Sequence, residues 1–158
     1  MATRTVEPWL CDPGDVVAKV VVYGAYGHAK VVTDILALTD YKVVGLIDYR
    51  HQWSVGEIVA GYPVLGDESV LPDVWTHGVR HAFVAIGDNA VRLRVGETLL
   101  QQGFQLINAV HPSSVVARSV RIGAGTMIGA HAVVNPATVI GSHVSVNTAA
   151  SVDHDGRA

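Results

Sequence analysis

The C-terminal third of the chain carries a branched aliphatic residue at every sixth position. The series is Val116, Ile122, Ile128, Val134, Ile140, Val146 and Val152. Four places after each of the first six stands a residue of a second, generally smaller series: Val120, Thr126, Ala132, Thr138, Val144 and Ala150. A six-residue period fits neither the 3.6-residue helix nor a long alternating strand. It predicts short strands joined by regular corners, in a narrow triangular coil of about eighteen residues per turn that stacks as a β-solenoid.

The first part of the chain alternates between strand and helix patterns. Near-continuous valines predict a buried strand at 19–23, and further apolar runs predict the strands 41–47, 82–86 and 104–109. Helical patterns follow the glycine-containing loop 24–27 and cover about 90–102, where Gly103 is a suitable residue just beyond the helix end. This alternation predicts an α/β domain with a small parallel sheet.

These patterns divide the chain into three segments. We expect an N-terminal extension at 1–18, a Rossmann-like α/β domain at 19–110 and a short β-solenoid at 111–158. The boundary is set at His111-Pro112, because proline restricts the preceding residue to an extended conformation. No aromatic residue follows Phe104, which agrees with a coil too narrow for rings.

Composition narrows the class of protein. With 158 residues, 49% of them hydrophobic, and a net charge of −3, the chain can bury a core and has no basic run, so nucleic-acid binding is not expected. No apolar run is long enough for a membrane span, and the first residues do not resemble a secretory signal. Cys11 is the single cysteine, which excludes an intrachain disulfide and favours a cytoplasmic location.

The loop Gly24–Gly27 predicts a pocket at the ends of the parallel strands. Glycine permits close approach of a ligand, and the helix that follows points its N–H groups toward an anion. Asp48 ends the next strand, where a carboxylate can accept a ribose hydroxyl proton. The alternative is a tight turn that merely needs glycine, with Asp48 as a strand terminator. His28 can be either a residue of the helix start or a substrate contact.

A histidine between two carboxylates marks the seventh hexad. Asp153 or Asp155 can hold His154 in one tautomer and raise its basicity if a corner of the coil brings them together. A polar corner without catalytic function is the alternative. His131 and His143 occupy the same hexad position two hexads apart, so they fall at different corners, and we expect surface residues there rather than a metal site.

Several segments, in this order and spacing, resemble one family: the bacterial NeuD/PglD-type sugar O/N-acyltransferases, which are hexapeptide-repeat acetyltransferases that include sialic acid O-acetyltransferases. The segments are VYGAYGH at 22–28, ID at 47–48, GYPVLG at 61–66, AIGDN at 85–89, HP at 111–112, and NT at 147–148 leading to SVDHD at 151–155. The resemblance implies an N-terminal Rossmann-like domain for a nucleotide-linked sugar. It also implies a C-terminal left-handed β-helix that forms homotrimers and binds acetyl-CoA between subunits.

The resemblance also implies roles for particular residues. His154 corresponds to the general base and Asp155 to the carboxylate that raises its basicity, with Asp153 as the less favoured partner. Positions that correspond to the nucleotide-sugar site are Tyr26, Gly27, His28, Asp48, Tyr49 and Gly87. The implied reaction is direct acetyl transfer to an amino or hydroxyl group, with neither an acyl-enzyme nor a metal ion.

Family members continue for several more hexads beyond the histidine–aspartate pair. The resemblance therefore implies that this chain is C-terminally truncated, with much of the acetyl-CoA site missing and acetyltransferase activity impaired. A different class of function is a nucleotide-sugar-binding module without catalysis. An NAD-dependent oxidoreductase is less favoured, because the glycine pattern is incomplete and a solenoid follows.

Overall fold

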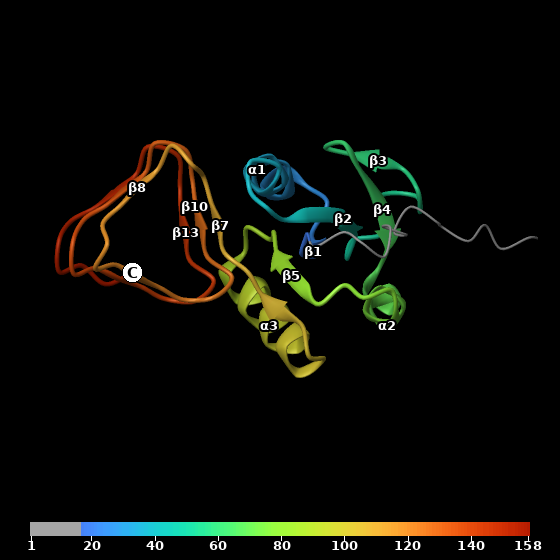
Figure 1. Ribbon diagram of the computed structural model, residues 1–158. Coiled ribbons are helices and arrows are strands. Elements are labelled where there is room, and N and C mark those ends of the chain that lie inside the picture. The colour runs from blue at the N-terminus through green and yellow to red at the C-terminus, as the bar shows by residue number, and fades with distance from the viewer. Residues whose placement is uncertain (1–16) are drawn as a thin grey trace, which may run out of the picture.

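The computed structural model describes residues 17–158 and has two parts (Figure 1). An α/β part is followed by a triangular prism of short strands that lies beside it. Most of the expected extension 1–18, including Cys11, lies outside the described residues. The two predicted architectures, an α/β layer structure and a β-helical stack, are thus both present.

Six strands form the sheet of the α/β part. They are β1 (Lys19–Tyr23), β2 (Lys42–Ile47), β3 (Ile58–Val59), β4 (Tyr62–Gly66), β5 (His81–Val84) and β6 (Gln105–Leu106), in the order β3-β4-β2-β1-β5-β6. All neighbouring pairs are parallel except β3 and β4, which are antiparallel. The sheet is therefore mixed at one edge, whereas the sequence pattern predicted a wholly parallel one.

Helices cover both faces of this sheet because its strands are apolar on both sides. Helix α1 (Gly27–Leu36) packs on one face. The opposite face packs against α2 (Leu71–Thr76) and α3 (Asn89–Gln101), and a short 3₁₀ helix, η1 (Glu68–Val70), precedes α2. Each face of the sheet has its own layer of core residues. Phe83 belongs to the layer on the α1 side and Ile47 to the opposite layer, and both are at most 1% exposed.

The prism is built from two-residue strands. They are β7 (Ala109–Val110), β8 (Val115–Val116), β9 (Arg121–Ile122), β10 (Met127–Ile128), β11 (Val133–Val134), β12 (Val139–Ile140), β13 (Ser145–Val146) and β14 (Ser151–Val152). They form three faces, ordered β13-β10-β7, β14-β11-β8 and β12-β9. Met127 pairs in parallel with Ala109 and Ser145, each eighteen residues away, which confirms the predicted length of one coil.

Both predicted residue series point into the prism. The seven aliphatic anchors all belong to its hydrophobic core, and Ile128 and Ile140 are at most 1% exposed. In the smaller series, Thr126 and Thr138 are fully buried, and each hydroxyl donates to a backbone carbonyl fifteen residues ahead, at Gly141 and Asp153, both at 2.8 Å. Threonine fits these buried positions because its hydroxyl group donates to a backbone carbonyl oxygen.

The corners share one backbone conformation. A left-handed residue recurs every six positions at Gly125 and then, with φ between 56° and 62°, at His131, Ala137, His143, Ala149 and Asp155. Such a residue turns the chain sharply between two flat faces, although it is an uncommon conformation for side chains other than glycine. The six-residue period of the sequence therefore reflects one corner per hexad.

The prism begins earlier than its sequence pattern indicated. The expected single strand 104–109 is wrong: β6 joins the α/β sheet, whereas β7 pairs with β10 of the prism. The face that contains β7, β10 and β13 is turned toward α1 (Figure 1). Ala109 and Met127 from this face share one hydrophobic core with Ala29 and Val32 of α1, so the two parts pack together.

Candidate functional site

The carboxyl ends of β1 and β5 lie at the point where the strand order of the sheet reverses. From β1 the chain proceeds to β2 on one side, and β5 lies on the other. A crevice at such a point is the usual ligand site of open α/β sheets. Gly24 turns the chain away from β1 here with φ 131°, and a Cβ atom on it would lie only 2.4 Å from the carbonyl oxygen of Ala85. Glycine is therefore required for the predicted loop.

A cavity of about 560 Å³ lies between this edge and the prism. It is lined by His28, Gly87, Asn89, Arg92, Leu93, Ser142, His143, Val144, Ser145 and Asn147. The lining comes from the start of α1, the start of α3 and the corner that leads into β13. Two of the predicted substrate-binding residues, His28 and Gly87, thus meet residues of the prism in one cavity.

The surroundings of the two histidines of the cavity lower the pKa of both. Burial lowers the pKa of His28 below its usual 6.5, and the positive charge of Arg92 lowers it further. The same two causes lower the pKa of His143, and Glu97 partly opposes them. His143 is only 7% exposed, so the expectation of a surface histidine at this corner is wrong. Within residues 17–158, His28 Nε2 and His143 Nδ1 are buried without a hydrogen-bond partner.

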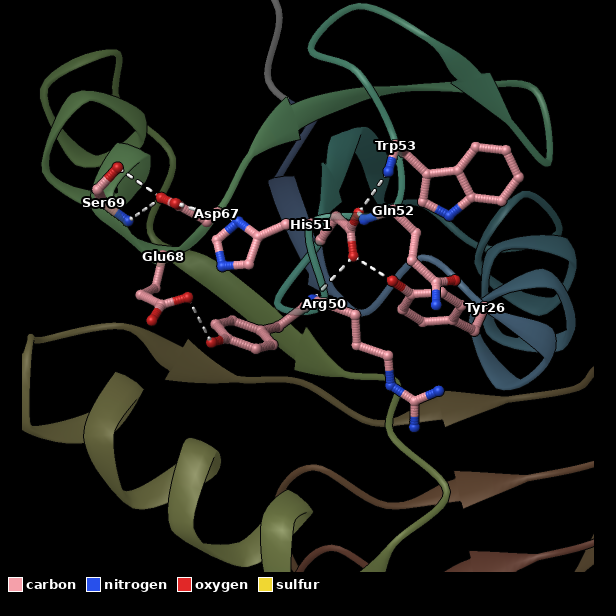
Figure 2. A network of polar contacts seen from close by, with 10 residues as sticks. Tyr26, Arg50, His51, Gln52, Trp53, Asp67, Glu68 and Ser69 are labelled. Carbon is pink, nitrogen blue, oxygen red and sulfur yellow. Dashed lines mark hydrogen bonds and ion pairs between the residues drawn. The ribbon is translucent and has the colours of Figure 1, made fainter.

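Asp48 accepts the hydrogen bonds of a separate polar network at the end of β2, and Figure 2 shows its partners Tyr26 and Trp53. Asp48 is 2% exposed, and its carboxylate accepts hydrogen bonds from the Tyr26 hydroxyl and from the backbone N–H groups of Arg50, Gln52 and Trp53. Burial alone would raise the pKa of Asp48, but these hydrogen bonds outweigh it and hold the pKa below 3.8. The carboxylate is therefore ionised, and its oxygens accept hydrogen bonds from residues of the same chain.

The predicted residues around Asp48 form an aromatic cluster. Tyr26 meets Tyr49 edge-on with ring centroids 5.8 Å apart, and Tyr49 stacks on Tyr23 at 6.2 Å. The guanidinium of Arg50 lies over the rings of Tyr26 and Tyr49, 4.9 and 5.3 Å from their centroids. Burial and the Asp48 carboxylate raise the pKa of Tyr26, so this phenol stays protonated and donates to Asp48. Asp48 thus fixes the aromatic residues rather than offering free oxygens.

His154 and Asp155 form the predicted pair on a corner of the prism. Asp155 adopts the left-handed corner conformation, with φ 57°, and this brings its Oδ2 within 2.7 Å of His154 Nδ1. The hydrogen bond and the charge of Asp155 raise the pKa of His154 above 6.5. Because an ionised carboxylate can only accept, Nδ1 is the protonated nitrogen and Nε2 carries the free lone pair.

The histidine–aspartate pair and the cavity lie at different places on the prism. The cavity borders the corner before β13, whereas His154 follows β14, at the corner between the other two faces. Side chains at 154 and 155 are 78% and 75% exposed. Within one chain, the predicted base therefore does not face the predicted sugar site.

Sequence reasoning missed several residues of the cavity. Arg92 is the most important of these, being 6% exposed at the centre of the contact between α3 and the prism. An arginine within an ordinary helical pattern gives no signal of burial, because three of the four acceptors of Arg92 are backbone carbonyls that any sequence supplies. Asn89 and Asn147 belong to the segments that carry the family resemblance, and the cavity gives both a position in the site.

A mixed α/β sheet with a crevice at its switch point, followed by a prism of short parallel strands, defines the class of proteins that join an N-terminal α/β domain to a C-terminal β-helix. The model of the PglD N-terminal domain matches residues 19–99, just over half of the chain. The chain therefore belongs to the PglD family.

Solved relatives share the fold at substantial identity. One is a His→Asn variant of perosamine N-acetyltransferase from Caulobacter crescentus in complex with CoA and GDP-perosamine, 40% identical, with a TM-score of 0.83 over 89% of this chain and 65% of that one. Another is the acetyltransferase domain of PglB from Neisseria gonorrhoeae in complex with acetyl coenzyme A, 36% identical, with a TM-score of 0.79 over 88% of this chain and 66% of that one.

A curated relative is UDP-N-acetylbacillosamine N-acetyltransferase of Bacillus subtilis, 32% identical over 114 residues, which are 69% of this chain and 50% of the relative. The chain thus spans about half the length of this relative and 65% of the perosamine enzyme. Among residues 17–158, no helix has the length and hydrophobicity that a membrane span needs. The same residues contain no group of three or more His, Cys, Asp or Glu side chains suited to a metal ion.

Proposed function

We propose that the chain is an acetyl-CoA-dependent acetyltransferase that modifies an amino or hydroxyl group of a nucleotide-linked sugar. The observation that carries this is the His154–Asp155 pair, whose hydrogen bond leaves Nε2 free to accept a proton. In the proposed reaction the acceptor nitrogen or oxygen attacks the thioester carbonyl and loses its proton to Nε2. The carbon–sulfur bond breaks, and the CoA thiolate leaves and takes up a proton, so that no acyl-enzyme forms.

The nucleotide-sugar site of this proposal is the cavity at His28 and Gly87 together with the cluster of Tyr26, Tyr49 and Arg50. A relative at 40% identity is described with GDP-perosamine and CoA, and another with acetyl coenzyme A, which supports both substrates. The start of α1 carries no side-chain cap, so its N–H groups are available to an anion. We assign the sugar-diphosphate part of the substrate to this region.

The proposed active unit is a homotrimer in the cytoplasm. His154 stands on a corner of the prism away from the cavity of its own chain, so a complete site needs the corner of a second copy beside that cavity. The flat faces of a triangular prism suit threefold packing, and Val139 and Val115, 37% and 61% exposed, supply apolar surface for it. Acetyl-CoA is assigned to the groove between prisms.

A steady-state assay of CoA release tests the proposal, with acetyl-CoA and UDP-, GDP- or CMP-linked amino sugars as substrates. Turnover that His154→Asn abolishes, and that His131→Asn at another exposed left-handed corner leaves unchanged, supports the enzyme. Binding of a nucleotide sugar without turnover overturns it in favour of a nucleotide-sugar-binding module. Binding of neither substrate overturns both functions.

A further inference from the structure

The guanidinium of Arg92 joins the walls of the cavity. Its Nε donates to the carbonyl oxygen of His143 in the prism at 2.8 Å. One terminal nitrogen donates to the carbonyl oxygens of Ile86 and Gly87 at 2.8 and 3.1 Å, and the other to Asn89 Oδ1 at 2.6 Å. All four acceptors are uncharged. The side chain thus ties the β5–α3 loop, the start of α3 and a corner of the prism to one point.

These contacts determine the orientation of the Asn89 side-chain amide. A guanidinium has only donors, so the amide atom that faces Arg92 must be the oxygen. The amide nitrogen then lies on the opposite side of the group. Asn89 lines the cavity and is exposed, and its Nδ2 makes no hydrogen bond with any residue in the described range 17–158.

We infer that Arg92 is a positioning residue that holds Asn89 with its N–H donors toward the cavity, so that the site selects ligands with an acceptor oxygen at this point. The charges of the cavity agree with this. Among the residues that the structure describes, the cavity lining contains one permanent cation, Arg92, and no carboxylate. A phosphate oxygen or a sugar hydroxyl oxygen fits such a donor, whereas an amine in the same place would face N–H groups.

The inference rests on the proposed nucleotide-sugar site, and Asn89→Asp separates it from a purely structural role. The new carboxylate keeps an acceptor toward Arg92, and makes it a charged one, so the fold is retained. The same change replaces the donor toward the cavity by an acceptor. A structural role for Asn89 predicts unchanged ligand affinity, whereas a donor role predicts a large loss.

The experiment is isothermal titration of the full chain with GDP, UDP, GDP-mannose and UDP-N-acetylglucosamine. For the ligand that the wild type binds, we expect Asn89→Asp to raise Kd at least tenfold while the thermal midpoint stays at or above the wild-type value. Gln105→Glu adds the same charge on the exposed end of β6 and should leave Kd within twofold. A loss with the nucleoside diphosphate alone assigns the acceptor to phosphate, and a loss confined to the sugar-linked ligand assigns it to the sugar.

Arg92→Lys keeps the positive charge, but a single ammonium nitrogen cannot donate to all four acceptor oxygens of Arg92. The Asn89 amide is then no longer held in one orientation. We expect weaker binding, and a smaller additional effect of Asn89→Asp in this background than in the wild type. Additive effects of the two changes, or an unchanged Kd in Asn89→Asp, overturn the inference while the proposed function stands. A wild-type chain that binds none of the ligands overturns the proposed function and the inference with it.

Discussion

The imidazole of His143 lies directly on the backbone of Gly96, where a Cβ atom would come within 2.0 Å of its Cε1. Gly96 is in the middle of α3, where glycine is otherwise unfavourable by about 1 kcal/mol relative to alanine. The imidazole of His143, which belongs to the prism, occupies the space that a side chain at position 96 would fill. This contact, together with Arg92, fixes the prism against the α/β sheet.

Gly96→Ala should therefore destabilise the chain, although alanine is the better helix former. The new methyl group must displace the imidazole, and overpacking of this kind typically costs about 1–3 kcal/mol. We expect a lower midpoint of thermal unfolding. The loss of stability caused by Gly96→Ala should be smaller in a His143→Ala background, where the ring is absent, than in the wild type. If the two changes are simply additive, the contact does not limit stability.

The buried histidines predict that acid weakens the fold. The pKa of His143 lies below 6.5 in the folded chain, so the unfolded chain binds a proton at higher pH than the folded one. The free energy of unfolding should then fall as the pH drops below about 6.5. The lowered pKa of His28 contributes in the same direction.

Urea unfolding between neutral and mildly acidic pH checks this, with His143→Asn as the test variant. We expect a shallower loss of stability with acid than in the wild type. His131→Asn, at an exposed corner with the same left-handed backbone, is the matched control and should follow the wild-type curve. A His143→Asn curve parallel to that of the wild type contradicts the prediction.

The repeating part of the fold was the easiest to predict. Every anchor from Val116 to Val152 faces the interior, because a six-residue period leaves one arrangement in which all aliphatic residues are buried. The neighbouring strand at 104–109 was predicted as one element, since apolar residues alone do not indicate which sheet they join. Its two halves pair with strands from different parts of the chain, β5 and β10, and such long-range pairing leaves no local signal.

The part of the site that could be predicted consists of reactive residues that are adjacent in the sequence. His154 and Asp155 are adjacent in sequence, and the corner brings them into contact. The hydrogen bonds that Asp48 accepts from the loop after it could not be predicted, because that loop folds back on the carboxylate without a local sequence signal. The contact of Arg92 with His143 joins residues 51 positions apart, which no sequence pattern reports.

Asp48→Asn should loosen the loop that carries Tyr49 and Arg50. The amide that replaces one oxygen presents N–H groups to donors of the backbone or of Tyr26, so at least one buried hydrogen bond is lost and a donor is left unpaired. We expect a destabilisation of roughly 2 kcal/mol at neutral pH. Chemical denaturation measures it, and Asp40→Asn at an exposed position is the control.

The lowered pKa of Asp48 gives this prediction a pH signature. Its contribution is present above the unfolded pKa of about 3.8 and is lost as the pH falls through the lower folded value. The difference between wild type and Asp48→Asn should therefore shrink in strong acid. A constant difference from neutral pH to strong acid would mean that the carboxylate charge is not what holds the loop.

The pair at the end of the chain allows a test that does not depend on catalysis. Asp155 raises the pKa of His154 mainly through the hydrogen bond to Nδ1, whereas Asp153 makes only a minor contribution. Asp155→Asn should bring the His154 pKa down toward 6.5, because the amide cannot compensate the imidazolium charge. NMR titration of the imidazole resonances measures this, and Asp153→Asn, with the same loss of charge one residue before the histidine, should shift the pKa much less. Equal shifts in the two variants would show that the bond at 2.7 Å is not what makes His154 the stronger base.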